Sequence, residues 1–93
     1  MSTFDDLCLL VKSVQMEDIS VKIGKRIITL RKANREGLSQ EKLAYIADVD
    51  RTYMTGIETG KRNVSVVVLA KIVKALDTDL ASFFNDESFR NED

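Results

Sequence analysis

Histidine is absent from this 93-residue sequence, and cysteine occurs once, as Cys8. The sequence also has no glycine-rich phosphate loop and no Cys or His spacing suited to a metal ion. Nucleophilic catalysis that pairs Ser or Cys with a His base therefore has no candidate residues. We expect no enzymatic activity, no metal and no cofactor. A single cysteine cannot form an internal disulfide, which favours a reducing cytoplasm, and Cys8 suits a small buried hydrophobe.

Long apolar runs are absent as well, so no segment is predicted to span a membrane. A signal peptide is not expected, because Phe4-Asp5-Asp6 places acidic residues where a basic stretch would stand. Hydrophobic residues make up 44% of the sequence and charged residues 31%, as in an ordinary globular protein. At this length we predict one domain with a modest core that needs neither disulfide nor metal.

Positive charge is scarce overall, since the formal net charge is −1, which taken alone argues against a nucleic-acid partner. The distribution of charge argues the other way. Between Val21 and Arg62, ten Lys and Arg accompany five Asp and Glu, giving a local charge of +5, while the rest of the chain carries −6. Phosphate binding depends on the local patch more than on the total. The middle of the chain is therefore the candidate DNA-binding region.

Within this region, residues 39–62 are predicted to form two short helices joined by a tight corner. Ser39 can cap the first helix. Asp48-Val49-Asp50 can make the corner, because Asp48 tolerates a left-handed backbone, Val49 can enter the core and Asp50 can cap the next helix. The second helix is predicted from Arg51 to about Glu58. A helix of this size, with an Arg, hydroxyl groups and a Tyr facing outward, suits the major groove of DNA.

Further helices are predicted on both sides of this pair from apolar residues at helical spacing. One runs from Ser20 to about Asn34. Another extends from a cap at Ser65 to Leu76, and a short helix with a cap at Thr78 or Asp79 covers residues 80–84. Residues 85–93 are polar and acidic, and we predict that they fray.

The N-terminal residues 1–18 are predicted to form a helical extension, because Leu7, Leu10, Val11 and Val14 recur at helical spacing. Three interpretations stay open. The helix packs on its own domain, it forms an arm for a dimer or another partner, or translation starts at Met16. The expected domain organisation is thus an extension at 1–18, a helix-turn-helix domain at 19–85 and an acidic tail at 86–93.

The arrangement of residues 39–62 also carries a family resemblance. The pattern consists of Ser39-Gln40-x-x-Leu43-Ala44, a corner ending at Val49, and Ile57-Glu58-x-Gly60-x-Arg62. It resembles the Cro/phage-repressor-like (XRE) helix-turn-helix family, over about residues 21–84. Asp48 departs from the usual Gly at the corner, and the link at 33–37 is longer than usual.

The segment 50–58, followed by Arg62-Asn63, is similar more narrowly to controller proteins of restriction–modification systems. The resemblance implies an all-α fold: a five-helix repressor-like domain, here with an additional N-terminal helix. It also implies a dimeric, sequence-specific transcriptional regulator that binds a pseudo-palindromic operator. Such a regulator acts on its own promoter and on that of the endonuclease gene.

Roles for individual residues follow from position and type. Arg51 can make a bidentate contact to guanine, worth about 1–3 kcal/mol of discrimination; alternatively it binds phosphate or pairs with Asp48. Tyr53 contacts DNA or, alternatively, fills the edge of the core. The base-reading candidates are Arg51, Thr52, Tyr53 and Thr55. The candidates for contact with the DNA backbone are Ser39, Gln40, Gly56, Lys61, Arg62 and Asn63.

Four expectations concern the residues around the base-reading candidates. Gly56 would be explained by close approach of the DNA backbone, since glycine inside a helix costs up to about 1 kcal/mol relative to Ala. Gln40 resembles the family glutamine that braces the recognition helix. Glu58 is expected to be structural, pairing with Arg62 or with a cation of the helix at 20–34 such as Arg26. Tyr45 is expected at the edge of the core.

Self-association is expected because one such domain reads only a few base pairs, whereas a two-fold dimer reads two half-sites about one helical turn apart. Leu80, Phe83 and Phe84 are the candidate dimer interface. The alternative is that these residues only complete the core.

A second function stays open, in which the same fold serves as an antitoxin or another protein-interaction module. Activation of transcription would require a contact with RNA polymerase, for which the acids Glu36 and Asp48 are candidates. The expected location is the cytoplasm of a prokaryote, in association with the nucleoid.

Overall fold

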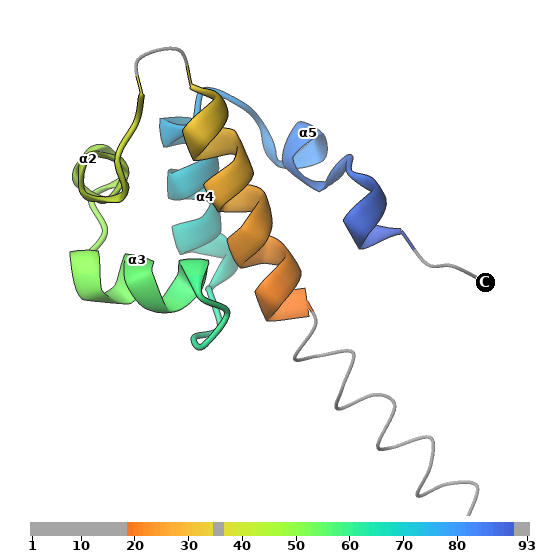
Figure 1. The fold of residues 1–93 in the computed structure, drawn as a ribbon, viewed down its shortest axis with the longest axis horizontal. Coiled ribbons are helices and arrows are strands. Elements are labelled where there is room, and N and C mark those ends of the chain that lie inside the picture. The colour runs from red at the N-terminus through yellow and green to blue at the C-terminus, as the bar shows by residue number, and fades with distance from the viewer. Residues whose placement is uncertain (1–18, 35–36, 91–93) are drawn as a thin grey trace, which may run out of the picture.

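The computed structural model describes residues 19–34 and 37–90, and every regular element within these ranges is a helix (Figure 1). A helix covers residues 19–33. It is followed by α2 (Gln40–Ala47), α3 (Arg51–Glu58), α4 (Val66–Ala75), α5 (Leu80–Phe84) and a 3-10 turn, η1 (Glu87–Phe89). The all-α fold class is confirmed. The helix predicted in the N-terminal extension lies outside the described residues.

Local capping sets where these helices begin. The Ser39 hydroxyl accepts a hydrogen bond from the backbone N–H of Lys42 at 3.0 Å, and the Asp50 carboxylate accepts one from Tyr53 at 3.2 Å. Ser65 caps α4 in the same way, and Asp79, rather than Thr78, caps α5. Each cap satisfies a backbone donor that the first helical turn leaves free. The predicted helix starts at 40, 51 and 66 are therefore confirmed.

The corner between α2 and α3 also forms as predicted. Asp48 is the C-cap of α2 and adopts the left-handed conformation, with φ 57° and ψ 49°. Val49, which follows it, is partly buried and packs against the core. The two acids on either side of Val49 thus end one helix and begin the next, because Asp48 is the C-cap of α2 and Asp50 caps α3.

The core draws one or more fully buried side chains from every helix: Ile27, Leu43, Met54, Ile57, Ile72 and Phe83. α2 packs against both α3 and α4, and α4 also contacts α5 (Figure 1). Tyr45 is not part of this core, since it is 85% exposed, so its predicted place at the core edge is wrong. It follows Leu43 by two positions, and at about 100° per residue such positions do not share a helix face.

Residues 85–90 are held on the domain, whereas composition predicts that residues 85–93 fray. Asp86 caps η1, and Phe89 packs near the ring of Phe84, with ring centroids 4.9 Å apart. The guanidinium of Arg26 donates to the carbonyl oxygen of Phe83 at 2.8 Å and forms an ion pair with Asp86 at 3.6 Å. Aromatic packing and this cation hold residues 85–90 on the domain, which polarity alone does not reveal.

Candidate nucleic-acid interface

The outward face of α3 is the candidate interface, and its spacing follows from helical periodicity. Met54, Ile57 and Glu58 are buried and fix α3 on the domain. Arg51, Thr52 and Thr55 are exposed. Because residues three and four apart share a face of a helix, burying one set turns the other toward solvent. Three of the four predicted base-reading residues therefore lie on an accessible edge.

Arg51 stands at the first position of α3 and its side chain is 70% exposed. Its guanidinium lies 3.9 Å from the carboxylate of Glu41, measured from Nη1 to Oε2. The alternative pairing with Asp48 is therefore not the one that the structure contains. Thr52, the next residue, has no hydrogen-bond partner for its hydroxyl within the described residues. Both headgroups can therefore reach a ligand.

Tyr53, the remaining base-reading candidate, is half-buried and packs against the core. Its hydroxyl donates to the backbone carbonyl of Asn63 at 3.3 Å. The guanidinium carbon of Arg62 lies 5.8 Å from the centre of the Tyr53 ring, within the range of a cation–π contact. The structure thus places Tyr53 as a link between α3 and the loop before α4, in line with the core-edge alternative.

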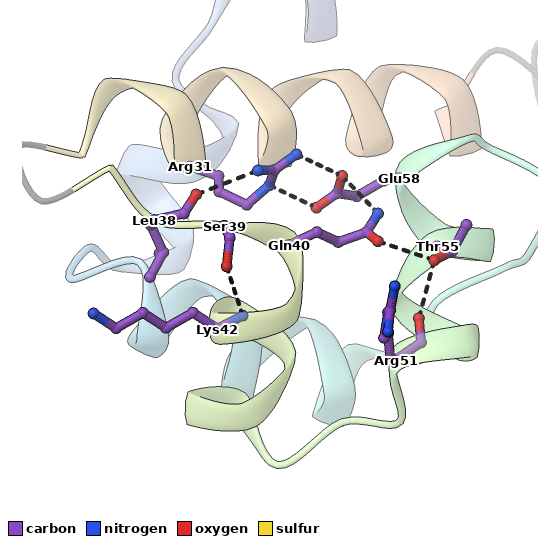
Figure 2. A network of polar contacts seen from close by, with 8 residues as sticks. All are labelled: Arg31, Leu38, Ser39, Gln40, Lys42, Arg51, Thr55 and Glu58. Atoms are coloured by element: carbon purple, nitrogen blue, oxygen red, sulfur yellow. Dashed lines mark hydrogen bonds and ion pairs between the residues drawn. The ribbon is translucent and has the colours of Figure 1, made fainter.

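A buried polar network holds α3 in place (Figure 2). Arg31 donates from Nε and Nη2 to the two carboxylate oxygens of Glu58, at 3.0 and 3.1 Å, and from Nη1 to the carbonyl of Leu38 at 3.2 Å. The Glu58 side chain is only 3% exposed. A bidentate, charge-assisted pair of this kind fixes both partners in geometry. The partner of Glu58 is therefore Arg31, a cation of the first helix as expected, although neither the example Arg26 nor the alternative Arg62 pairs with it.

Gln40 extends this network from α2 to α3. Its Nε2 donates to Glu58 at 3.1 Å, and its Oε1 accepts from the hydroxyl of Thr55 at 3.0 Å (Figure 2). The Thr55 hydroxyl also lies 3.1 Å from the carbonyl oxygen of Arg51. The bracing role expected for Gln40 is thus present in the geometry. Its amide keeps one N–H free for a phosphate.

The loop 60–63 folds back over the end of α3, and Gly56 makes room for it. The backbone N–H groups of Lys61 and Arg62 donate to the carbonyl of Gly56 at 2.9 and 3.1 Å. A Cβ at position 56 would lie 2.7 Å from Cγ of Arg62. The structure therefore supplies an intramolecular reason for Gly56, while the predicted approach of the DNA backbone stays a prediction.

The other loop residues are exposed, and the loop is also tied to the first helix. The side-chain oxygen of Asn63 accepts a hydrogen bond from the hydroxyl of Ser20 at 2.9 Å. Gly60 has φ +77°, and a Cβ there would lie 2.8 Å from the side chain of Val21. Lys61, Arg62 and Asn63 thus belong to a loop that is tied both to α3 and to the first helix.

Gly24 has a structural role that the sequence reasoning missed. A Cβ at this position would lie 2.5 Å from the carbonyl oxygens of both Ile57 and Glu58. The helix of residues 19–33 therefore approaches the end of α3 too closely for any side chain at this point. A glycine in the middle of a helical pattern was the signal, because its cost relative to Ala requires a packing reason.

The proposed interface residues of α5 separate into two groups. Leu80 and Phe84 are 37% and 39% exposed, and they remain candidates for an interface. Phe83 is 0% exposed and completes the core of its own domain, so its side chain is not on the surface. Adjacent positions on a helix point about 100° apart, so only one of the two phenylalanines can face the core.

Within the described residues, no group of three or more His, Cys, Asp or Glu is arranged to hold a metal ion. Over the same residues, no helix has the length and apolar character needed to cross a membrane.

Comparison with known proteins agrees with this geometry. The helix-turn-helix family model matches residues 27–83. The chain is 46% identical over 71 residues to the control protein C.MunI of Mycoplasma sp., covering 76% of this chain and 95% of that protein. It is 42% identical over 59 residues to the control protein C.BamHI of Bacillus amyloliquefaciens, covering 63% and 72% of the two chains.

Among solved structures, the restriction-modification controller protein C.AhdI from Aeromonas hydrophila superposes with a TM-score of 0.65 at 46% identity. The superposition covers 70% of this chain and 96% of that one. Sequence pattern, helix geometry and similarity therefore agree. The chain belongs to the helix-turn-helix family and, within it, to the restriction–modification controller proteins, which are DNA-binding transcriptional regulators rather than enzymes.

Proposed function

We propose that two copies of this chain bind a pseudo-palindromic operator upstream of their own gene and of an endonuclease gene, with one α3 of the dimer in each half-site. The observation that carries this proposal is the exposed edge of α3, held by a buried ion pair and a braced glutamine. A rigid edge suits base reading, because the orientation of hydrogen-bonding groups is fixed before DNA arrives.

Arg51 and Thr52 are the residues that we propose for base reading. Arg51 can donate two hydrogen bonds to O6 and N7 of guanine, and Thr52 can bond a base or contact a thymine methyl group. Thr55 has a narrower role, because its one hydroxyl proton is directed to Gln40 or to the Arg51 carbonyl. It can therefore only accept from DNA, from an adenine or cytosine amino group. Tyr53 contacts DNA from beside these exposed residues of α3.

Phosphate contacts surround the exposed edge of α3 that carries Arg51 and Thr52, which we call the reading edge. Lys61, Arg62 and Asn63 come from the loop after α3, while Ser39 and Gln40 stand at the N-terminus of α2, where helix N–H groups attract anions. Gly56 contributes by allowing Arg62 to lie across α3. Contacts of this kind set affinity and register without reading sequence.

Dimerisation is proposed through Leu80 and Phe84, which leave apolar surface on α5. If the interface involves these residues, replacing both by Ser should yield monomers in sedimentation velocity, with the core residue Phe83 untouched. A dimer that persists would place the interface elsewhere. For activation we propose the exposed Asp48 as a contact for RNA polymerase, in a regulator that works at the nucleoid of a prokaryotic cytoplasm.

The decisive experiment is a mobility-shift titration on DNA from upstream of the chain's own gene, against a scrambled duplex of equal length. Arg51→Ala should abolish the preference for the upstream DNA. Lys61→Ala should weaken binding to both duplexes alike and reduce the salt slope by about 1. Equal operator preference in wild type and Arg51→Ala would show that the base-reading assignment is wrong. Wild-type protein that binds neither duplex would favour the antitoxin alternative.

A further inference from the structure

The Arg51–Glu41 ion pair joins the reading edge of α3 to the first turn of α2. Its two side chains are 70% and 75% exposed, and the charged atoms are 3.9 Å apart. Glu41 takes no part in the buried network, and it lies in the first turn of α2, with its carboxylate near the start of α3 where Arg51 stands. The pair is therefore open to competition from any group that binds either side chain.

The other charged groups around Arg51 do not offer the same contact. The Asp50 carboxylate is engaged as the cap of α3, where it accepts from the backbone of Tyr53. Lys42, the neighbour of Glu41 on α2, extends away from Arg51 (Figure 2). Asp48 is exposed in the corner and has no ion pair within the described residues. Glu41 is thus the acid that holds the Arg51 guanidinium in the free protein.

We propose that Glu41 is a specificity-determining positioning residue, which holds Arg51 away from phosphates on DNA that lacks the correct guanine. This inference rests on the proposed base-reading role of Arg51. On non-cognate DNA the competitor for Arg51 is a phosphate, and the Glu41 carboxylate both occupies the guanidinium and repels that phosphate. On the operator, the paired acceptors of guanine provide a bidentate partner that displaces Glu41.

The Arg51–Glu41 ion pair has a strength suited to selection against DNA that lacks the correct guanine. An exposed ion pair contributes little, so it yields readily to a stronger partner. Removing the Glu41 charge should therefore strengthen binding to scrambled DNA by roughly two- to five-fold, the range that an exposed pair can supply. Operator binding should change less, so that the ratio of the two affinities falls by about the same factor.

The test uses the full chain and its Glu41→Gln variant, with binding to the operator and scrambled duplexes measured over a series of KCl concentrations. If Arg51 is released to a phosphate, the salt slope on scrambled DNA steepens by about 0.9, the value for one additional neutralised phosphate. The operator slope should not steepen. Glu41 is largely exposed, so the variant should unfold in urea at the wild-type midpoint.

Two further variants separate this mechanism from loss of a negative charge in general. Asp48→Asn removes an exposed acid from the same corner while keeping a residue that tolerates the left-handed backbone, and it should leave the affinity ratio unchanged. In an Arg51→Ala background, Glu41→Gln should alter neither the ratio nor the slope.

A Glu41→Gln effect of equal size on both duplexes, or one that persists without Arg51, would overturn the proposal. The failure of the base-reading role itself is distinguishable, because Arg51→Ala would then keep the operator preference.

Discussion

Arg31→Met removes the cation from the buried network while keeping a straight apolar side chain of similar length. It deletes three donated hydrogen bonds, two to Glu58 and one to the Leu38 carbonyl. Removing one partner of a buried pair costs about 3–5 kcal/mol. We expect about 3 kcal/mol here, because the Arg31 side chain is 14% exposed and Gln40 still donates to Glu58. A domain with about 5–10 kcal/mol of total stability would lose a large part of it.

Urea unfolding at neutral pH measures this loss. With a slope of about 1–2 kcal/mol per M, the midpoint should fall by about 2 M while the slope stays constant. Lys32→Met is the matched control: it deletes a cation from the next position, which is exposed, and should change stability by no more than about 0.5 kcal/mol.

The combined variant Arg31→Met/Glu58→Met should recover most of the lost stability, because apolar packing often replaces a buried ion pair at little cost. A cost below about 1 kcal/mol for Arg31→Met alone, or a double variant less stable than either single one, would refute the reasoning. The double variant also tests function. Gln40 would lose its acceptor on Glu58, so we expect weaker operator preference in a protein of nearly normal stability.

Three further predictions concern glycines and acid sensitivity. Gly24→Ala should cost about 1–3 kcal/mol in urea unfolding, because its Cβ meets backbone oxygens 2.5 Å away; an unchanged midpoint would contradict the close approach of the helices. Gly56→Ala is the matched comparison at another helical glycine, where the new Cβ would meet only the side chain of Arg62. Stability should therefore change by under about 1 kcal/mol, while DNA affinity falls. Hydrogen bonds from the side chain and backbone of Ser88, and then Arg26, hold the pKa of Asp86 below its ordinary 3.8. The ionised Asp86 therefore contributes to folding stability above pH 3.8, and this contribution is lost as the pH falls below that value. Asp86→Asn should therefore make the free energy of unfolding depend less on pH below pH 4. An unchanged dependence on pH would contradict this.

The helix boundaries could be predicted because each depends on a cap within three residues. Ser39, Asp50 and Ser65 begin their helices through a side-chain oxygen and the N–H three positions later. Asp48 ends α2 through its tolerance of the left-handed backbone. Such rules need no knowledge of tertiary packing, so the sequence alone was sufficient.

Which cation of the first helix pairs with Glu58 could not be predicted in the same way. Arg31 is separated from Glu58 by 27 residues, and no local rule distinguishes it from the other cations of its helix. Its guanidinium reaches a carboxylate that is almost fully buried. Long, flexible side chains reach several neighbours, and the burial of the partner decides between them. Arg26 was misassigned for the same reason, since it reaches carbonyls of α5.

The hydrogen bonds of α3 also reduce the number of base-reading candidates that residue type suggested. Outward position on α3 made Thr52, Tyr53 and Thr55 equivalent candidates, but their hydrogen bonds are not equivalent. Tyr53 donates to the loop before α4 and Thr55 to the interior, whereas the Thr52 hydroxyl is uncommitted within the described residues. A group already bonded inside the protein must give up that bond, or use its remaining acceptor, to contact a base. Discrimination between operators should therefore depend on Arg51 and Thr52 first, and substitutions at Thr55 should alter the alignment of α3 together with its DNA contacts.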